Sequence, residues 1–176
     1  MVLERLDTER LRLRVLALDD IAELMALDSD PEVMRYVTGG RSTPRAEMEA
    51  TLRGSLGHRW MAFEREQDAF VGWFGLRPSA PAERELGYRV RRAAWGRGLA
   101  TEGARTMVAA AFTRLDASRV WAQTMTVNAA SRRVLERCGL RYVRTFHLEW
   151  PERIEGTELG DVEYEILRAD WQAAQT

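Results

Sequence analysis

One short segment constrains this chain more than any other, and it reads Trp95-Gly96-Arg97-Gly98-Leu99-Ala100-Thr101-Glu102-Gly103. It follows a strand-like run over residues 83–90 and opens a helical pattern that ends near Leu115. A glycine-rich turn at the start of a helix presents free backbone N–H groups, and the helix dipole adds partial positive charge there. The segment is therefore typical of a site that holds a phosphate group.

Two common phosphate-binding loops do not match this segment. The Walker loop needs a lysine after its second glycine, and all 26 basic residues of this chain are arginine. The dinucleotide fingerprint needs a third glycine, where this chain has Thr101. That fingerprint also follows a first strand, whereas this segment lies past the middle of the chain. The absence of lysine further excludes Schiff-base chemistry by a lysine amine.

Composition and charge argue against several kinds of binding partner and site. The chain has 176 residues, of which 45% are hydrophobic and 30% charged, which is typical of one globular domain spanning residues 1–176. Its net charge of −1 gives no reason to expect nucleic acid or an anionic membrane as a partner. With Cys138 as the only cysteine and His58 and His147 as the only histidines, we expect neither a disulfide nor a metal site. The N-terminus lacks the apolar core of a signal peptide and no apolar run reaches the length of a membrane span, so we expect a cytoplasmic protein.

Hydrophobic periodicity predicts an α/β fold with a mixed, mostly antiparallel sheet of about seven strands, flanked by helices on both faces. Strands are expected over residues 9–16, 59–65, 69–76, 83–90, 120–125, 140–150 and 161–167. Helices are expected from Asp19, from Asp30, over residues 42–57, from the glycine-rich segment to Leu115, and from Asn128 to Arg137. A loop is expected over residues 78–81 and a short tail from Asp170. The strand–helix–strand unit over residues 83–125 implies one parallel pair of strands.

The glycine-rich segment resembles the pyrophosphate loop of the GNAT superfamily, the CoA-dependent N-acetyltransferases. The family pattern is Gln/Arg-x-x-Gly-x-Gly/Ala; here Gly98 and Ala100 fill the last two positions, and Trp95 replaces the leading residue. The whole segment is similar to the loop of the ribosomal-protein N-terminal acetyltransferases, the RimJ/RimL-type branch. A second segment, from Asn128 to Leu140, resembles the second half of the GNAT core. Together with the closing strand, the resemblance covers nearly the whole chain.

The resemblance implies that acetyl-CoA is the co-substrate and that no metal takes part. The fourth and fifth strands of the family splay apart, and the pantetheine arm lies in the opening. Backbone groups of Tyr88, Arg89 and Val90 would pair with that arm like an extra strand. The loop around the phosphates would comprise Trp95, Gly96, Arg97, Gly98, Leu99, Ala100 and Thr101.

The resemblance also assigns residues beyond the loop. Asn128 would reach the pantetheine side. Arg132 or Arg133 would meet the outer phosphate or the adenine, and the alternative for each is a solvated charge on the helix surface. Because Cys138 lies on the apolar stripe of its helix, we expect it to pack in the core, and we expect His147 to be structural.

The implied reaction is direct attack of a neutral amine on the thioester in a ternary complex, without an acyl-enzyme. Glu85 lies near where many family members place their general base, and its alternative is a solvent-facing strand carboxylate; Glu149 is a weaker candidate. Leu135 stands where the family usually has the tyrosine that protonates the leaving thiolate. Ser131 is the substitute acid that we expect, with helix capping as its alternative role.

Two classes of function remain open at the level of sequence. The first is an N-acetyltransferase whose acceptor is a protein N-terminus, as in the ribosomal branch, or a small amine such as a polyamine, an amino acid or an antibiotic. The second is a non-catalytic acyl-CoA sensor on the same fold, which would suit the missing tyrosine and the missing leading Gln/Arg. In both cases we expect a monomer or a homodimer.

Overall fold

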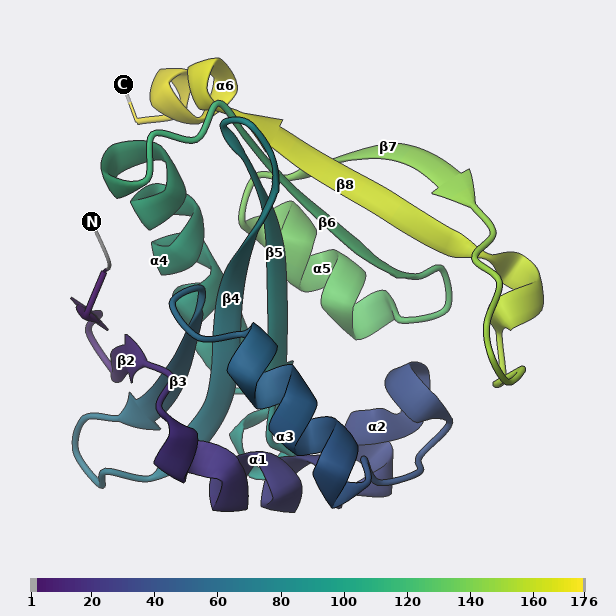
Figure 1. Ribbon diagram of the computed structural model, residues 1–176. Helices are drawn as coiled ribbons and strands as arrows, with labels where there is room; N and C mark the ends of the chain where they lie inside the picture. The colour runs from purple at the N-terminus through teal and green to yellow at the C-terminus, as the bar shows by residue number, and fades with distance from the viewer. Residues whose placement is uncertain (1–2, 176) are drawn as a thin grey trace.

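The computed structural model describes residues 3–175, and its strands form one eight-stranded sheet in the order β1-β2-β3-β4-β5-β6-β8-β7 (Figure 1). The strands are β1 (Arg5–Asp7), β2 (Leu11–Val15), β3 (Arg59–Glu64), β4 (Phe70–Ala80), β5 (Glu83–Val90), β6 (Arg119–Met125), β7 (Arg141–Phe146) and β8 (Asp161–Leu167). Every neighbouring pair is antiparallel except β5 and β6, which are parallel. The predicted mixed, mostly antiparallel α/β architecture is therefore confirmed.

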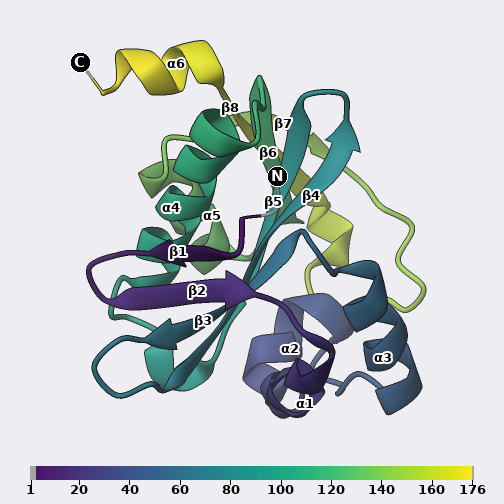
Figure 2. The ribbon, with the colours of Figure 1, turned by 60° about the vertical axis from the view of Figure 1, so that its left-hand side comes forward.

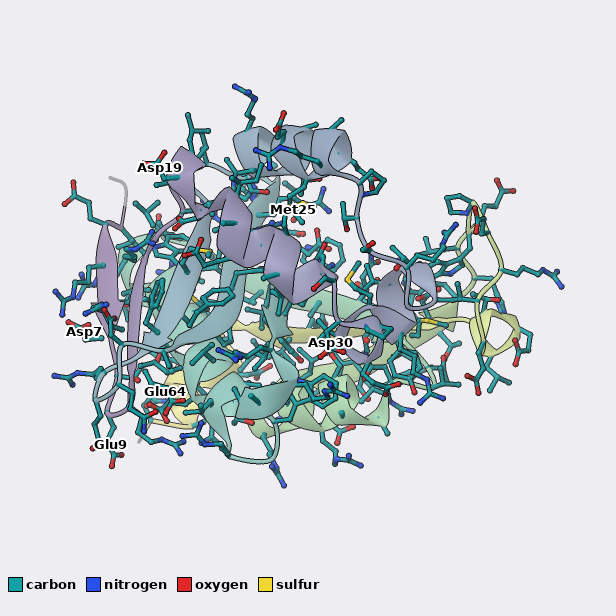
Figure 3. All side chains as sticks on the ribbon, turned by 90° about the horizontal axis from the view of Figure 1, so that it is seen from below. Asp7, Glu9, Asp19, Met25, Asp30 and Glu64 are labelled. Atoms are coloured by element: carbon teal, nitrogen blue, oxygen red, sulfur yellow. The ribbon has the colours of Figure 1, made fainter. Side chains whose placement is uncertain are left out.

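Helices cover both faces of this sheet. They are α1 (Ile21–Asp28), α2 (Pro31–Thr38), α3 (Arg45–Gly54), α4 (Leu99–Arg114), α5 (Ala129–Arg137) and α6 (Arg168–Ala173). Figure 2 shows α4 and α5 on one side of the strands and α1, α2 and α3 on the other. The view from below in Figure 3 places Met25 on α1 and Asp30 at the start of α2, both on this second side. Among the described residues, no helix is long and apolar enough to cross a membrane.

The alternation of side chains along β3 explains why two apolar layers form. Trp60 and Ala62 point into the larger cluster, which α4 covers, whereas Met61 and Phe63 belong to the smaller cluster with α1 and α3. Successive residues of a strand face opposite sides of a sheet, so a strand buried on both faces reads as a continuous apolar run. Apolar side chains and helices therefore cover both faces of the sheet in its central part.

Several sequence predictions at element ends were wrong. The expected loop over residues 78–81 is in fact the end of β4, which continues to Ala80 and turns into β5 at Pro81 and Ala82. The pairing of β4 with β5 shifts register between Pro78 and Ala80, and such a bulge accommodates a proline that cannot donate to the ladder. The tail that begins near Asp170 is helical, as α6.

Two strands also differ from their predicted extent. β1 was not predicted, because three residues with one half-buried leucine, Leu6, carry no periodicity. The predicted strand over residues 140–150 ends at Phe146, and residues 147–150 are irregular. Both differences lie at the two edges of the sheet, where tertiary contacts rather than local pattern decide strand length.

The pairing of β5 with β6 is short, and this positions the candidate site. The two strands pair only from Glu83 with Arg119 to Glu85 with Trp121. Beyond that point β5 runs on to Val90 and β6 to Met125 without pairing to each other. Figure 1 shows the two strands together near α6 and apart at their other ends, with α5 beside the opening. The splayed parallel pair that the family resemblance implies is therefore present.

Candidate active site

A cavity of about 660 Å³ lies where β5 and β6 separate. Its walls come from the second half of β5, the segment from Ala94 to Thr101, the end of β6 and the inner side of α5. On the other face of the sheet it reaches α2, Leu148, Trp150 and Asp161. The site residues predicted from the sequence line this cavity, except Arg97, Glu85 and the two weaker alternatives, Arg132 and Glu149. The volume falls within the usual range for small-molecule sites.

The glycine-rich loop has the geometry of an anion cradle. Gly96 and Gly98 have φ angles of 72° and 79°, a left-handed conformation that glycine adopts without steric cost. Gly98 is the N-cap of α4, and within residues 3–175 no backbone acceptor is recorded for the N–H groups of Gly96 to Thr101. A Cβ atom on Gly96 would meet nothing within 4 Å, so the space in front of the loop is open. Because Gly96 and Gly98 to Thr101 line the cavity, these donors and the start of the α4 dipole lie at its wall.

A set of polar contacts braces this loop from behind. Glu102 accepts hydrogen bonds from the Thr8 hydroxyl at 2.5 Å, the Arg10 backbone N–H at 2.9 Å and the Arg10 Nε at 2.7 Å. Arg10 Nη1 also donates to the carbonyl oxygen of Arg97 at 2.8 Å. Although burial opposes its ionisation, the bonds from Thr8 and Arg10 hold the pKa of Glu102 below its ordinary value. Glu102, for which sequence reasoning found no role, therefore ties the first turn of α4 to β2.

The side chain of Arg97 points away from the cavity. Its guanidinium makes two bonds to the Glu64 carboxylate, at 2.7 and 2.6 Å, and Figure 3 labels Glu64 at the end of β3. Only the backbone of Arg97 is thus available to a ligand at the loop.

Trp95 replaces the leading polar residue of the family pattern, and the structure gives it a defined contact. Its indole Nε1 donates to the carbonyl oxygen of Val90 at 2.7 Å, while 46% of the residue remains exposed. This bond fixes the loop to the end of β5. Trp95 is also one of the residues that line the cavity.

Tyr88, Ser131 and Asn128 lie close together where β5 faces α5. The Tyr88 hydroxyl is 3.0 Å from Ser131 Oγ, and the Asn128 side chain accepts from the Ser131 backbone N–H at 3.1 Å, which caps α5. Burial raises the pKa of Tyr88 well above its ordinary value, so this phenol stays protonated. Sequence reasoning considered only the backbone of Tyr88; its hydroxyl beside Ser131 is a finding of the fold.

The two arginines on α5 that the sequence left as alternatives differ in their contacts. Arg132 donates to the Tyr164 hydroxyl and to the Thr126 carbonyl oxygen, both at 3.1 Å, and it does not line the cavity. Arg133 and Arg137 line the cavity, and neither forms an ion pair with another residue in the described range. They lie four residues apart and so share one side of the helix. Arg137 is a candidate that sequence reasoning missed.

The two glutamates named as general bases lie outside the cavity lining. Glu85 occupies the paired section of β5 opposite Trp121, and its carboxylate forms an ion pair with Arg77. Glu149 lies between the lining residues Leu148 and Trp150 but does not line the cavity itself. The structure does not bring either carboxylate to the separated strands.

Asp161, at the start of β8, is the buried carboxylate that lines the cavity. It is 3% exposed and accepts hydrogen bonds from Trp150 Nε1 at 3.3 Å and from the backbone N–H of Leu148. Burial raises its pKa above the ordinary value, despite these bonds and the nearby His147. The sequence offers no signal for this residue beyond its place after Gly160, because its environment comes from segments distant in the chain.

Cys138 packs in the core, as expected, whereas His147 is exposed beyond the end of β7. Cys138 is buried, its thiol lies 3.7 Å from the Thr101 carbonyl oxygen, and burial raises its pKa to about 12, so it is not a nucleophile. The His147 ring nitrogen Nε2 lies 3.3 Å from the carbonyl oxygen of Glu158, outside the cavity lining.

The chain is similar in sequence and in fold to known acetyltransferases. The model of the acetyltransferase (GNAT) domain matches residues 10–141. A relative from Aspergillus fumigatus, an FsC-acetyl coenzyme A-N(2)-transacetylase, is 38% identical over an alignment of 190 positions, which covers 97% of this chain and 79% of the relative.

Two solved structures share the fold at low sequence identity. Spermidine N-acetyltransferase from Vibrio cholerae, solved with CoA and spermine, has a TM-score of 0.80 at 18% identity, over 94% of this chain and 99% of that one. A ribosomal L7/L12 alpha-N-protein acetyltransferase, solved with coenzyme A, has a TM-score of 0.76 at 18% identity, over 93% and 98% of the two chains.

Proposed function

The chain belongs to the GNAT acetyltransferase family, and we propose that its cavity brings acetyl-CoA and a primary amine together for direct transfer of the acetyl group. One observation carries this proposal. A single cavity begins at the phosphate-type loop of α4, passes through the opening between β5 and β6, and ends on the opposite face at a buried carboxylate. Such a passage lets two substrates approach each other from opposite sides of a sheet.

The residues of the cavity fit acetyl-CoA. Donors from Gly96 to Thr101 would hold the pyrophosphate, and Arg133 and Arg137 would meet the more distant phosphate. The unpaired edge of β5 beyond Glu85 offers backbone groups to the pantetheine amides. When bound, acetyl-CoA supplies an acetyl group activated as a thioester.

Ser131 and Tyr88 are placed to give a proton to the sulfur that leaves. The Ser131 hydroxyl lines the cavity, and the protonated Tyr88 phenol lies 3.0 Å behind it. A proton passing from Ser131 could be replaced from Tyr88 within the same hydrogen bond. This pair would occupy the role of the family tyrosine, whose position is taken by the buried Leu135.

We favour a small primary amine over a protein N-terminus as the acceptor. The relative at 38% identity is named for transfer to an N(2) position, whereas the protein N-terminal acetyltransferase shares only the fold at 18% identity. The RimJ/RimL-type branch, a monomeric or homodimeric state and a cytoplasmic location remain predictions from the sequence.

Release of CoA thiol in the presence of different amines tests this proposal. Purified protein is incubated with acetyl-CoA and, separately, with spermidine, phenethylamine, an α-amino acid and a peptide with a free N-terminus. We expect amine-dependent thiol release with at least one small amine and none with the peptide. Tight binding of acetyl-CoA without release with any amine would favour the sensor alternative, and faster release with the peptide would overturn the choice of acceptor.

A further inference from the structure

We propose that Asp161 is a catalytic residue that receives the acceptor as a cationic primary amine and removes its proton before attack. This inference rests on the proposed function and names the residue and the class of substrate that the acceptor side of the cavity takes. The Asp161 carboxylate is 3% exposed, lines the cavity and forms no ion pair with any residue in the range 3–175.

The other carboxylates on the same face of β8 are paired with arginines. Asp161, Glu163 and Glu165 alternate along the strand and so share one face of the sheet. Glu163 is bound by Arg119 at 2.6 Å and by Arg144 at 2.8 Å, and Glu165 is bound by Arg119 at 2.7 Å. Only the member of this row that reaches the cavity lacks a guanidinium partner. A buried carboxylate without a cation is costly unless a ligand supplies one.

The charged groups around the acceptor side leave this carboxylate free. His147, on the segment after β7, is the titratable group that interacts with Asp161, and it weakly favours the ionised form. From α2, Arg35 is paired with Glu155, and Glu32 is a second, non-buried carboxylate of the lining. From β5, Arg89 is paired with Asp28 at 2.5 Å. The arginines of α5, Arg133 and Arg137, carry the remaining positive charge of the lining.

The position of Asp161 suits proton removal. In the β6–β8 ladder it is opposite Met125, at the end of β6 that has separated from β5. Trp150 Nε1 and the N–H of Leu148 each donate one bond to the carboxylate, which orients it and leaves further lone pairs for a ligand. The raised pKa that burial imposes brings this base nearer to neutrality, where a general base is most effective.

Proton removal precedes bond formation in the proposed step. The ammonium of the acceptor gives one proton to the Asp161 carboxylate and becomes a neutral amine. The nitrogen lone pair then forms a C–N bond with the thioester carbonyl carbon, and the C–S bond breaks with its electron pair staying on sulfur. The nitrogen of the resulting adduct loses its second proton to solvent, while sulfur gains one proton from Ser131, which is restored from solvent through Tyr88. Asp161 then returns its own proton to solvent, so that one proton is released in each reaction.

The walls next to Asp161 indicate the rest of the acceptor. Val33 and Tyr36 of α2, with Leu148 and Trp150, present apolar and aromatic surface on this side of the cavity. An ammonium group on an aliphatic or aromatic stem matches a carboxylate at the end of such a wall. We therefore infer a cationic amine on an apolar stem, for which phenethylamine is a suitable probe and spermidine a comparison with several charges.

The test uses Asp161→Asn, with Glu165→Gln as the matched control. Both variants replace a carboxylate by an amide on the same face of β8, but Glu165 does not line the cavity. With acetyl-CoA and phenethylamine at pH 7, we expect kcat/KM of Asp161→Asn to fall between about 100-fold and about 10,000-fold. We expect Glu165→Gln to retain its rate, and both variants to bind acetyl-CoA as the unmodified protein does.

The pH profile separates catalysis from a structural role. In the unmodified protein, kcat/KM should fall as pH drops through the raised pKa of Asp161, whereas in Asp161→Asn the rate should follow the fraction of free amine and recover at high pH. An equal loss at every pH, an unchanged rate, or activity with neither phenethylamine nor spermidine in a protein that binds acetyl-CoA would overturn this inference. Failure to bind acetyl-CoA would instead overturn the proposed function.

Discussion

The two sides of the cavity are built in different ways. On the side of α4 and α5, the lining offers backbone N–H groups of the loop, which two glycines in the left-handed conformation and a capped helix hold in place. On the side of α2 and β8, the contacts are side chains from segments more than a hundred residues apart, such as Tyr36 and Asp161. The first construction depends on a local pattern, and the second on each individual side chain. A site of this kind can keep one substrate while its acceptor side changes.

The close contact of α4 with the sheet gives the largest expected effect on stability. A Cβ atom on Gly103 would lie 2.3 Å from Cζ of Phe74, and that ring is fully buried. Gly103→Ala should therefore lower the free energy of unfolding by about 1–3 kcal/mol, measured by urea denaturation. Gly54→Ala is the matched control, because a Cβ atom there meets nothing within 4 Å; it should stabilise α3 by up to about 1 kcal/mol. Equal effects at the two glycines would contradict this tight packing.

The next largest effect is expected from changes to the Tyr88–Ser131 pair. These changes should lower the rate of acetyl transfer without weakening the binding of acetyl-CoA. Ser131→Ala and Tyr88→Phe should each lower kcat by about tenfold, less than the general range for acid catalysis because a thiolate is a good leaving group. Since the two hydroxyls are 3.0 Å apart and act in sequence, the double variant should lose no more than the worse single variant. Pre-steady-state thiol release measures the chemical step. Additive losses would show that the two hydroxyls act independently.

The ionisation of Asp161 should affect the stability of the folded protein as well as the reaction rate. Burial raises the pKa of Asp161 above the value of the unfolded chain, so its ionised form destabilises the folded protein at neutral pH. Asp161→Asn should therefore be more stable than the unmodified protein at pH 7, and the difference should vanish as pH falls through the raised pKa towards the ordinary value. Thermal unfolding between pH 4 and pH 8 checks this sign. A variant that is less stable at every pH would show that the carboxylate serves the fold.

The smallest effects are expected from the arginines of α5. Arg133→Gln and Arg137→Gln should each raise KM for acetyl-CoA only a few-fold, because an exposed ionic contact contributes about 0.2–1 kcal/mol. The increase should shrink at high salt. Arg132→Gln is the control on the same helix: it loses its bonds to Tyr164 and Thr126, so it should change stability while KM stays constant. Steady-state kinetics at low and high ionic strength would distinguish the three variants.

This comparison also explains what could be predicted from the sequence. The loop from Trp95 to Thr101 and the cap at Asn128 were recognisable because glycines and cap residues act within a few positions of the chain. The side chains of Tyr88 and Asp161 were not, because their partners come from α5 and from the segment before β8. For the same reason β1 was not predicted, because its pairing with β2 is a tertiary contact. Local signals thus predicted the loop and most of the sheet, whereas the acceptor side needed the folded structure.

Calorimetric titration with acetyl-CoA tests the central claim most directly, using Gly98→Trp and its control Gly57→Trp. Both glycines have positive φ angles, 79° and 82°, so the strain of the substitution is matched, but only Gly98 lines the cavity. We expect the unmodified protein and Gly57→Trp to bind acetyl-CoA alike, and Gly98→Trp to bind at least about 100-fold more weakly, or about 2.7 kcal/mol. Equal binding by the two variants, or none by the unmodified protein, would contradict the assignment of this loop to the phosphates of acetyl-CoA.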